Sequence, residues 1–244
     1  MADVSVGQKA PDFELPDQTG FPWSLTGQLM TGPVMLVFYA GDWCPYCNGQ
    51  LVSFAREYEE FERRGVQVAG ISVDPPEFNA EMHGKLMLPF PLLSDARGEL
   101  SKLYGLWDED EGVAKPSIVV LDQPLEIKHL YVGDDFSDRP ENKVVFAALS
   151  KLDSPVGGPV SGEPKIRLLA SEAASDTVRP DRPAMSLDQL FTYYQGNYSA
   201  TVTLKKRLGG IILGGNRATR EVERYQQMIV RYRDAFQQTI RMKS

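Results

Sequence analysis

A strand-length apolar run, followed at once by a cysteine pair and an amphipathic helix, is the feature that most constrains this chain. The run covers residues 34–39, and the pair is Cys44 and Cys47. An unbroken apolar run of this length predicts a strand covered on both faces of its sheet. The residues after the pair predict a helix that ends near Gly65, because apolar side chains recur there at spacings of three and four: Leu51, Phe54, Tyr58 and Phe61.

The elements around this run predict an α/β domain over residues 1–153. A second strand at residues 66–73 completes a strand-helix-strand unit, whose crossover is almost always right-handed and whose strands are parallel. Turn residues and apolar runs predict the remaining elements: an opening hairpin over 7–20, a short helix at 99–104, strands at 117–121 and 126–132, and a helix at 142–152.

The rest of the chain predicts a helical extension over residues 186–244, joined by a linker or draped loop at 154–185 that is rich in Pro, Gly, Ser and Asp. Ser186 and Gln189 have the spacing of a capping box, which marks a helix start. A last helix presents an apolar seam with three- and four-residue spacings: Val222, Tyr225, Ile229, Tyr232 and Phe236. Packing of this seam on its own domain and packing on a second copy are equally open.

Charge is distributed unevenly along the chain. After Leu204 there are ten basic and three acidic residues, although the whole chain has a net charge of −7. An acidic body with a basic end is typical of self-docking, an acidic partner or an anionic surface, and also of a plain solvated helix face. We expect no nucleic-acid partner.

The cysteine pair predicts thiol redox chemistry. The first turn of a helix stabilises a thiolate through its unpaired N–H groups and its dipole, and Pro45 suits that turn. Cys44 is therefore predicted to be the attacking thiolate, and Cys47, one turn on, the resolving thiol. Two cysteines cannot form a disulfide framework. Two other interpretations are a zinc site, which lacks ligands at the right spacing, and two inert buried thiols. No metal or other cofactor is expected.

Three groups of residues resemble the alkyl hydroperoxide reductase/thiol-specific antioxidant family, which comprises peroxiredoxins and related redoxins. The resemblance spans roughly residues 5–152 and is carried by Gly7-Gln8-Lys9-Ala10-Pro11-Asp12-Phe13, by Trp43-Cys44-Pro45-Tyr46-Cys47 and by Pro91-Leu92-Leu93-Ser94-Asp95. It implies a thioredoxin fold, that is, a central mixed sheet flanked by helices, with the helical C-terminal extension added. It also implies a thiol-disulfide oxidoreductase or thiol peroxidase that uses Cys44 and Cys47.

Supporting residues are expected next to the pair: Trp43, Pro45, Tyr46, Lys115 and Pro116. Pro116 opens a strand where thioredoxin-fold proteins keep a cis-proline facing the cysteines, although a trans-proline can also begin a strand. Lys115 would either lower a thiol pKa or be solvated.

The resemblance leaves the oxidant open. Typical peroxiredoxins carry Pro-x-x-x-Thr-x-x-Cys, and counting back from Cys44 this chain has Val37 and Gly41 at the proline and threonine positions. The substrate is therefore either a hydroperoxide or a protein disulfide, and the electron donor a thioredoxin-like protein or a small thiol. The alternative is a binding module whose basic C-terminal helices mediate dimerisation or partner docking.

The chain shows neither a signal-peptide pattern at its start nor an apolar window of about 18 residues. We therefore expect a cytoplasmic protein without a membrane partner.

Overall fold

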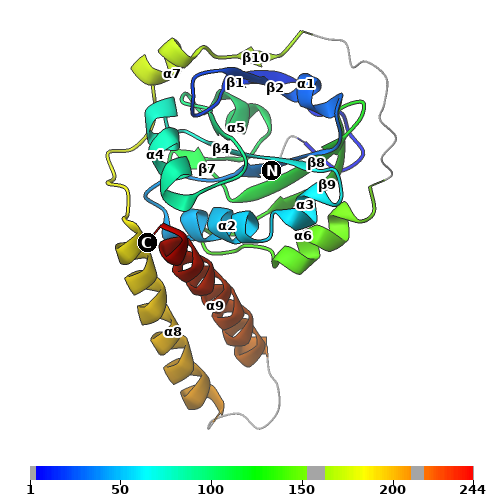
Figure 1. Cartoon of the computed structure of the whole chain (residues 1–244). Coiled ribbons are helices and arrows are strands. Elements are labelled where there is room, and N and C mark those ends of the chain that lie inside the picture. The colour runs from blue at the N-terminus through cyan, green and yellow to red at the C-terminus, as the bar shows by residue number, and fades with distance from the viewer. Residues whose placement is uncertain (1–3, 153–162, 210–216, 244) are drawn as a thin grey trace.

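The central sheet is built from the apolar runs that the sequence marks as strands. A computed structural model describes residues 4–152, 163–209 and 217–243 (Figure 1). Its five-stranded sheet has the order β5-β4-β3-β8-β9. The three strands β3, β4 and β5 run parallel, and β8 and β9 are antiparallel to their neighbours. The bounds are β3 Val34–Phe38, β4 Gln67–Ser72, β5 Leu92–Ser94, β8 Ser117–Asp122 and β9 Glu126–Val132.

The strand β3 lies at the centre of the sheet and all five of its residues are buried. Its alternate side chains enter two different cores, because successive residues of a strand point to opposite faces. Met35 and Val37 join the core under α2 (Pro45–Arg56), whereas Leu36 lies on the other face. The predicted doubly covered strand and the parallel strand-helix-strand unit are therefore confirmed.

Helices cover one face of the sheet and a small second sheet covers the other (Figure 1). The first layer consists of α2 with α3 (Glu59–Glu62), α4 (Pro76–Leu86) and α6 (Asn142–Leu149). The opposite layer contains β1 (Phe13–Pro16), β2 (Pro22–Ser24), α1 (Leu25–Leu29) and α5 (Glu99–Leu103). Two further short strands, β6 (Trp107–Asp108) and β7 (Val113–Ala114), pair with each other.

The predicted helix that ends near Gly65 is wrong in one respect, because it is broken into α2 and α3. Glu57 ends α2 with non-helical backbone angles, and its carboxylate accepts a hydrogen bond of 2.9 Å from Asn142 at the start of α6. Tyr58 and Phe61 nevertheless pack on the same core as α2. The apolar spacing therefore identifies the buried face but does not report the break.

The segment after residue 162 is attached to the body. Its strand β10 (Ile166–Arg167) pairs in parallel with β1, and α7 (Ala170–Ser175) follows. The chain then enters α8 (Leu187–Gly209), whose predicted capping box is confirmed by two reciprocal hydrogen bonds between Ser186 and Gln189. Among the described helices, none combines the length and the apolar composition that a membrane crossing requires.

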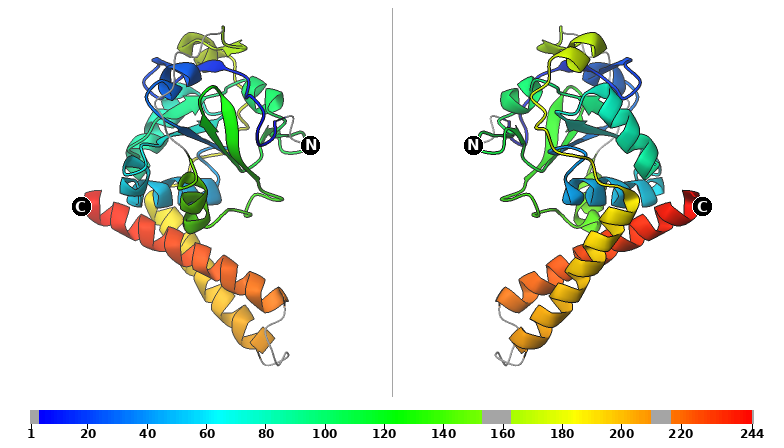
Figure 2. Two further views of the ribbon diagram at one scale, coloured as in Figure 1. Left: turned by 90° about the vertical axis from the view of Figure 1, so that its right-hand side faces the viewer. Right: turned by 90° about the vertical axis from the view of Figure 1, so that its left-hand side faces the viewer.

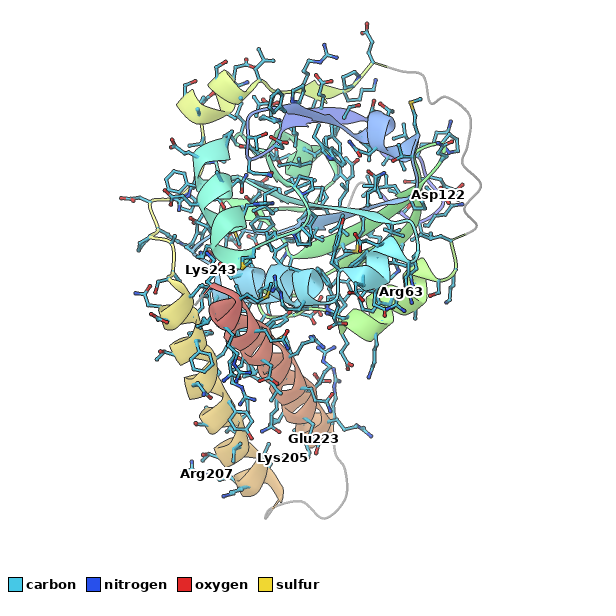
Figure 3. The ribbon with its side chains drawn as sticks, in the orientation of Figure 1. Arg63, Asp122, Lys205, Arg207, Glu223 and Lys243 are labelled. Atoms are coloured by element: carbon cyan, nitrogen blue, oxygen red, sulfur yellow. The ribbon has the colours of Figure 1, made fainter. Side chains whose placement is uncertain are left out.

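The helices α8 and α9 (Arg217–Lys243) form a hairpin that projects from the α2 side of the body (Figure 2). The predicted seam of α9 packs on its own chain, since Ile229, Tyr232 and Phe236 are fully buried in the core that contains α2. At the far end of the hairpin Lys205 pairs with Glu223 at 3.0 Å and Arg207 is exposed, whereas Lys243 lies beside the body (Figure 3).

The hairpin rests on α2 at Gly49. A Cβ atom at this position would lie 2.4 Å from Tyr232 Cδ2 and 2.6 Å from the Tyr194 hydroxyl. Tyr194 also donates a hydrogen bond of 2.9 Å to the carbonyl of Pro45. Close approach of the two aromatic rings to the helix backbone therefore requires glycine.

Gly49→Ala is expected to lower the free energy of unfolding by about 1–3 kcal/mol, because the added methyl group overpacks the hairpin contact. The measurement is urea denaturation followed by circular dichroism. Gly84→Ala is the matched control, because Gly84 lies in α4 and a Cβ atom added there would have nothing within 4 Å. This change should stabilise the protein by about 0.5–1 kcal/mol. An unchanged stability of Gly49→Ala would contradict the tight docking of the hairpin.

Candidate active site

The two cysteines lie at the amino end of α2. Cys44 is the N-cap residue, with Pro45 in the first turn, and its sulfur accepts a hydrogen bond of 3.3 Å from the Cys47 backbone N–H. Both cysteines are free thiols. The predicted position of the pair, at a helix start directly after the central strand, is therefore confirmed.

A tight turn connects β3 to the cysteine pair. The Cys44 N–H donates to the Gly41 carbonyl at 3.2 Å, and Asn48 Nδ2 donates to the carbonyls of Asp42 and Cys44 at 2.7 and 2.8 Å. A Cβ atom at Gly41 would lie 2.1 Å from the Trp43 ring. Gly41 therefore lets the indole fold back over the turn.

Arg139 reaches the pair from the loop between β9 and α6. Its Nη2 lies 3.3 Å from Cys47 Sγ and its Nη1 donates to Gln50 Oε1 at 2.7 Å, while the residue is 5% exposed. No ion pair joins Arg139 to a carboxylate among the described residues. A buried guanidinium requires a counter-charge, and the Cys47 thiolate is the group placed to supply it.

The ionisation of the pair differs from the prediction that Cys44 is the thiolate. Burial alone would raise the pKa of Cys47, but the Cys44 thiol and the Arg139 guanidinium lower this pKa to about 6. The hydrogen bond to Cys47, together with burial, raises the pKa of Cys44 well above its ordinary value. Arg139, which no local pattern of the sequence indicates, therefore favours the thiolate on Cys47 over the one on Cys44.

The pKa of the Arg139 guanidinium is shifted in the direction that a neighbouring thiolate predicts. Burial on its own would lower the pKa of its guanidinium, but the neighbouring Cys47 and Cys44 raise it. Arg139 therefore remains a cation next to the thiolate.

A cavity of about 770 Å³ opens over Cys44. Four of the predicted supporting residues line it together with Cys44, namely Trp43, Pro45, Lys115 and Pro116. Cys47 is fully buried, whereas Cys44 is 8% exposed. A molecule that enters this cavity therefore meets Cys44 first.

The remaining supporting residue, Tyr46, lies outside this lining. It is 4% exposed, packs edge-on against Phe136 with 5.4 Å between ring centroids, and shares a hydroxyl hydrogen bond with Tyr225 of α9. Tyr46 therefore joins the first turn of α2 to the hairpin.

The predicted cis-proline at Pro116 is wrong. In the described part of the chain the cis peptide bond is Gln123–Pro124, and the Lys115–Pro116 bond is trans. Pro116 directly precedes β8, and its carbonyl accepts a hydrogen bond of 2.8 Å from the Gly133 N–H. A trans bond is the lower-energy form for X-Pro and it suits this extended entry into the strand.

The sequence reasoning missed Arg139 and Gln50. Arg139 is 92 residues from Cys47 in the chain, in a loop without a motif. Only its unusual burial identifies it, and burial at such a distance is not visible in a local pattern.

Comparisons with known proteins agree on one family. The AhpC/TSA family model matches residues 6–130. A selenocysteine-containing peroxiredoxin, PrxU, from Peptoclostridium acidaminophilum is 33% identical over 149 residues, which cover 55% of this chain and 73% of that protein. Peroxiredoxin Q, chloroplastic, from Populus jackii is 39% identical over 105 residues, which cover 43% of this chain and 49% of that protein. The chain thus spans about half the length of that plant relative.

A solved structure extends the similarity to three dimensions. The crystal structure of peroxidoxin BcpB from Mycobacterium tuberculosis is similar with a TM-score of 0.56 and 28% identity, covering 62% of this chain and 99% of that one. The expected α/β fold with a central mixed sheet flanked by helices is therefore confirmed.

Proposed function

The chain belongs to the AhpC/TSA family, and from this we propose that it is a thiol peroxidase that cycles Cys44 and Cys47 between dithiol and disulfide. The observation that carries the proposal is the division of roles within the pair. Cys44 opens on a large cavity, while Cys47, one helical turn away, holds the ionised charge beside Arg139.

The proposed reaction begins with transfer of the Cys44 proton to Cys47. The Cys44 sulfur attacks the distal oxygen of a hydroperoxide, so that an S–O bond forms and the O–O bond breaks. The alcohol or water leaves with the proton held by Cys47, and Cys44 becomes a sulfenic acid. The Cys47 thiolate then attacks Cys44, and hydroxide departs to become water as the disulfide forms. An external dithiol or small thiol returns two electrons and two protons.

Thiol-disulfide exchange is the second candidate activity. The cavity over Cys44 has a volume of about 770 Å³, which exceeds the space that one peroxide group needs. Similarity favours the peroxidase, however, because the relatives that the chain matches are named peroxiredoxins.

Stopped-flow oxidation distinguishes the two activities. Trp43 lines the cavity beside Cys44, so its fluorescence should follow the oxidation of the pair. We expect the reduced protein to react with hydrogen peroxide or an alkyl hydroperoxide on the order of a hundredfold faster than free cysteine at the same pH. A rate equal to that of free cysteine would exclude the peroxidase and leave disulfide exchange.

The partners and the compartment are proposed with the same activity. A thioredoxin-like protein or a small thiol would reduce the disulfide, and a free dithiol suits the reducing cytoplasm. A homodimer through the C-terminal helices would use their exposed faces, because the seam of α9 already packs on its own body. Light scattering of the full chain tests the homodimer: the mass of a single chain would exclude it and leave the exposed faces of these helices to another partner.

A further inference from the structure

Arg179 comes from the part of the chain that follows the matched family residues, yet it lies beside the cysteine pair. Its side chain is 8% exposed. Its Nη2 donates to Asp42 Oδ1 at 2.7 Å and its Nε donates to Asp74 Oδ1 at 2.9 Å. Asp42 and Asp74 are 1% and 0% exposed, so one guanidinium joins two buried carboxylates.

The two carboxylates belong to the loops that shape the site. Asp42 lies within the turn from Gly41 to Cys44, and Asp74 follows the end of β4. The Asp42 N–H also donates to Asp74 Oδ2 at 2.8 Å. Arg179, Asp42 and Asp74 are therefore each hydrogen-bonded to the other two. These contacts hold both the backbone N–H and the carboxylate of Asp42, in the turn before Cys44.

The guanidinium also covers an aromatic wall of the site. It lies 4.9 Å from the centroid of the Trp43 ring and 4.0 Å from that of Phe78. Cations at these distances are attracted to the ring faces. Arg179 thus stabilises the position of the Trp43 indole, which lines the cavity over Cys44.

The segment that carries Arg179 is itself anchored. The Thr177 hydroxyl donates to the Val73 carbonyl at 2.9 Å, and the Val178 N–H donates to the Ala96 carbonyl at 2.8 Å. The backbone just before Arg179 is therefore held against the body. A loose segment would lose more backbone entropy in holding this geometry.

The positive charge of Arg179 compensates the two buried carboxylates of Asp42 and Asp74. Burial and the neighbouring Asp42 raise the pKa of Asp74 to about 7, while Arg179 opposes this rise. Without the guanidinium, two buried carboxylates would face each other without a hydrogen-bonded cation, since Lys85 interacts with them only through its charge, and such groups either take up a proton or move toward water. Movement of Asp42 would carry the turn, and with it Cys44.

We propose that Arg179 is a positioning residue for Cys44: it fixes the turn of residues 41–44 through Asp42 and Asp74 and holds Trp43 against the cavity. This rests on the proposed role of Cys44 as the sulfur that attacks. The active unit then extends beyond the family domain to include the segment around Arg179.

The test uses the full chain and iodoacetamide, with the Cys44 adduct followed by mass spectrometry at pH 7. Cys44 reacts with iodoacetamide as the thiolate that forms when its proton passes to Cys47, so a displaced turn should slow alkylation by separating the two groups. Arg179→Gln is expected to slow it at least tenfold at a temperature where circular dichroism shows a folded protein, and to change the Trp43 emission. Arg97→Gln is the control, because the Arg97 side chain pairs with Glu172 and Asp176 of the same segment and, in the described part of the chain, its ion pairs do not involve Asp42 or Asp74. It should stay within twofold of the native rate.

A rescue separates positioning from general disruption. Asp42→Asn combined with Arg179→Gln restores a neutral hydrogen-bonding pair, and we expect it to regain at least threefold in rate over Arg179→Gln. An Arg179→Gln rate within twofold of the native one, or a double variant no faster than the single one, would overturn the proposal. If Arg179→Gln does not fold, Arg179→Lys gives the same decision, since at least a threefold loss is expected and a loss below twofold overturns it.

Alkylation needs no peroxide, so the result is independent of the proposed peroxidase activity. A protein that fails to reduce hydroperoxides can still show the Arg179 effect. Conversely, a peroxidase whose alkylation is insensitive to Arg179 would contradict only this inference.

Discussion

Cys44→Ser is expected to abolish peroxide turnover completely, because serine oxygen at this position cannot form the sulfenic acid that the reaction requires. The loss should exceed about a thousandfold, since the substrate cavity then contains no reactive sulfur. The measurement is the steady-state consumption of an alkyl hydroperoxide with dithiothreitol as reductant.

Cys47→Ser is the informative counterpart. It should still allow one round of oxidation at Cys44, and a sulfenic acid should accumulate that a dimedone probe labels. Labelling of Cys47 in the Cys44→Ser protein, with turnover retained, would instead assign the attack to Cys47 and reverse the proposed roles.

Arg139→Met is expected to lower the rate of peroxide reaction at pH 7 by about 30-fold. In the native protein the pKa of Cys47 is about 6, so the thiolate forms as the pH rises through 6 and is mostly present at pH 7. Loss of the cation should return this pKa toward the ordinary thiol value of about 8.5, which leaves only a few per cent ionised at pH 7. The pH dependence of the oxidation rate measures the shift directly.

Two further variants make this result specific. Arg139→Lys keeps a positive charge but loses the paired contacts to Cys47 and Gln50, so its midpoint should lie between those of the native and Arg139→Met proteins. Arg63→Met removes an exposed arginine on the surface of the same helical layer and should leave the profile unchanged (Figure 3). A native midpoint near 6 retained in Arg139→Met would refute the assignment of Arg139 as the partner of the thiolate.

Local patterns predicted the parts of the fold that depend on neighbouring residues. The run at 34–39 and the pair after it identified the central strand and the start of α2, because burial on two faces and a helix start both leave signals within a few residues. The capping box at Ser186 is of the same kind. The seam of α9 predicted a buried face, but only the structure shows that α2 and α8 cover it.

Long-range contacts account for what the sequence did not reveal. The charge on the cysteine pair depends on Arg139, and the turn before Cys44 depends on Arg179, 137 residues away from Asp42. Neither arginine lies in a recognisable motif, and both are buried against the usual tendency of this residue type. The error about Pro116 has a similar origin, since an analogy of position cannot show the backbone pairing that makes a trans bond suitable there.

The spacing of the two sulfurs has one more consequence. Peroxide first yields an unstable oxygenated sulfur, and a second oxidant molecule would convert it irreversibly to a sulfinic acid. Cys47 lies one turn after Cys44 in α2, and Tyr194 of the hairpin is hydrogen-bonded to the first turn of this helix. We therefore expect the disulfide to form without unfolding of α2. If Cys44 is oxidised as proposed, we expect capture by Cys47 one helical turn away to compete with this over-oxidation.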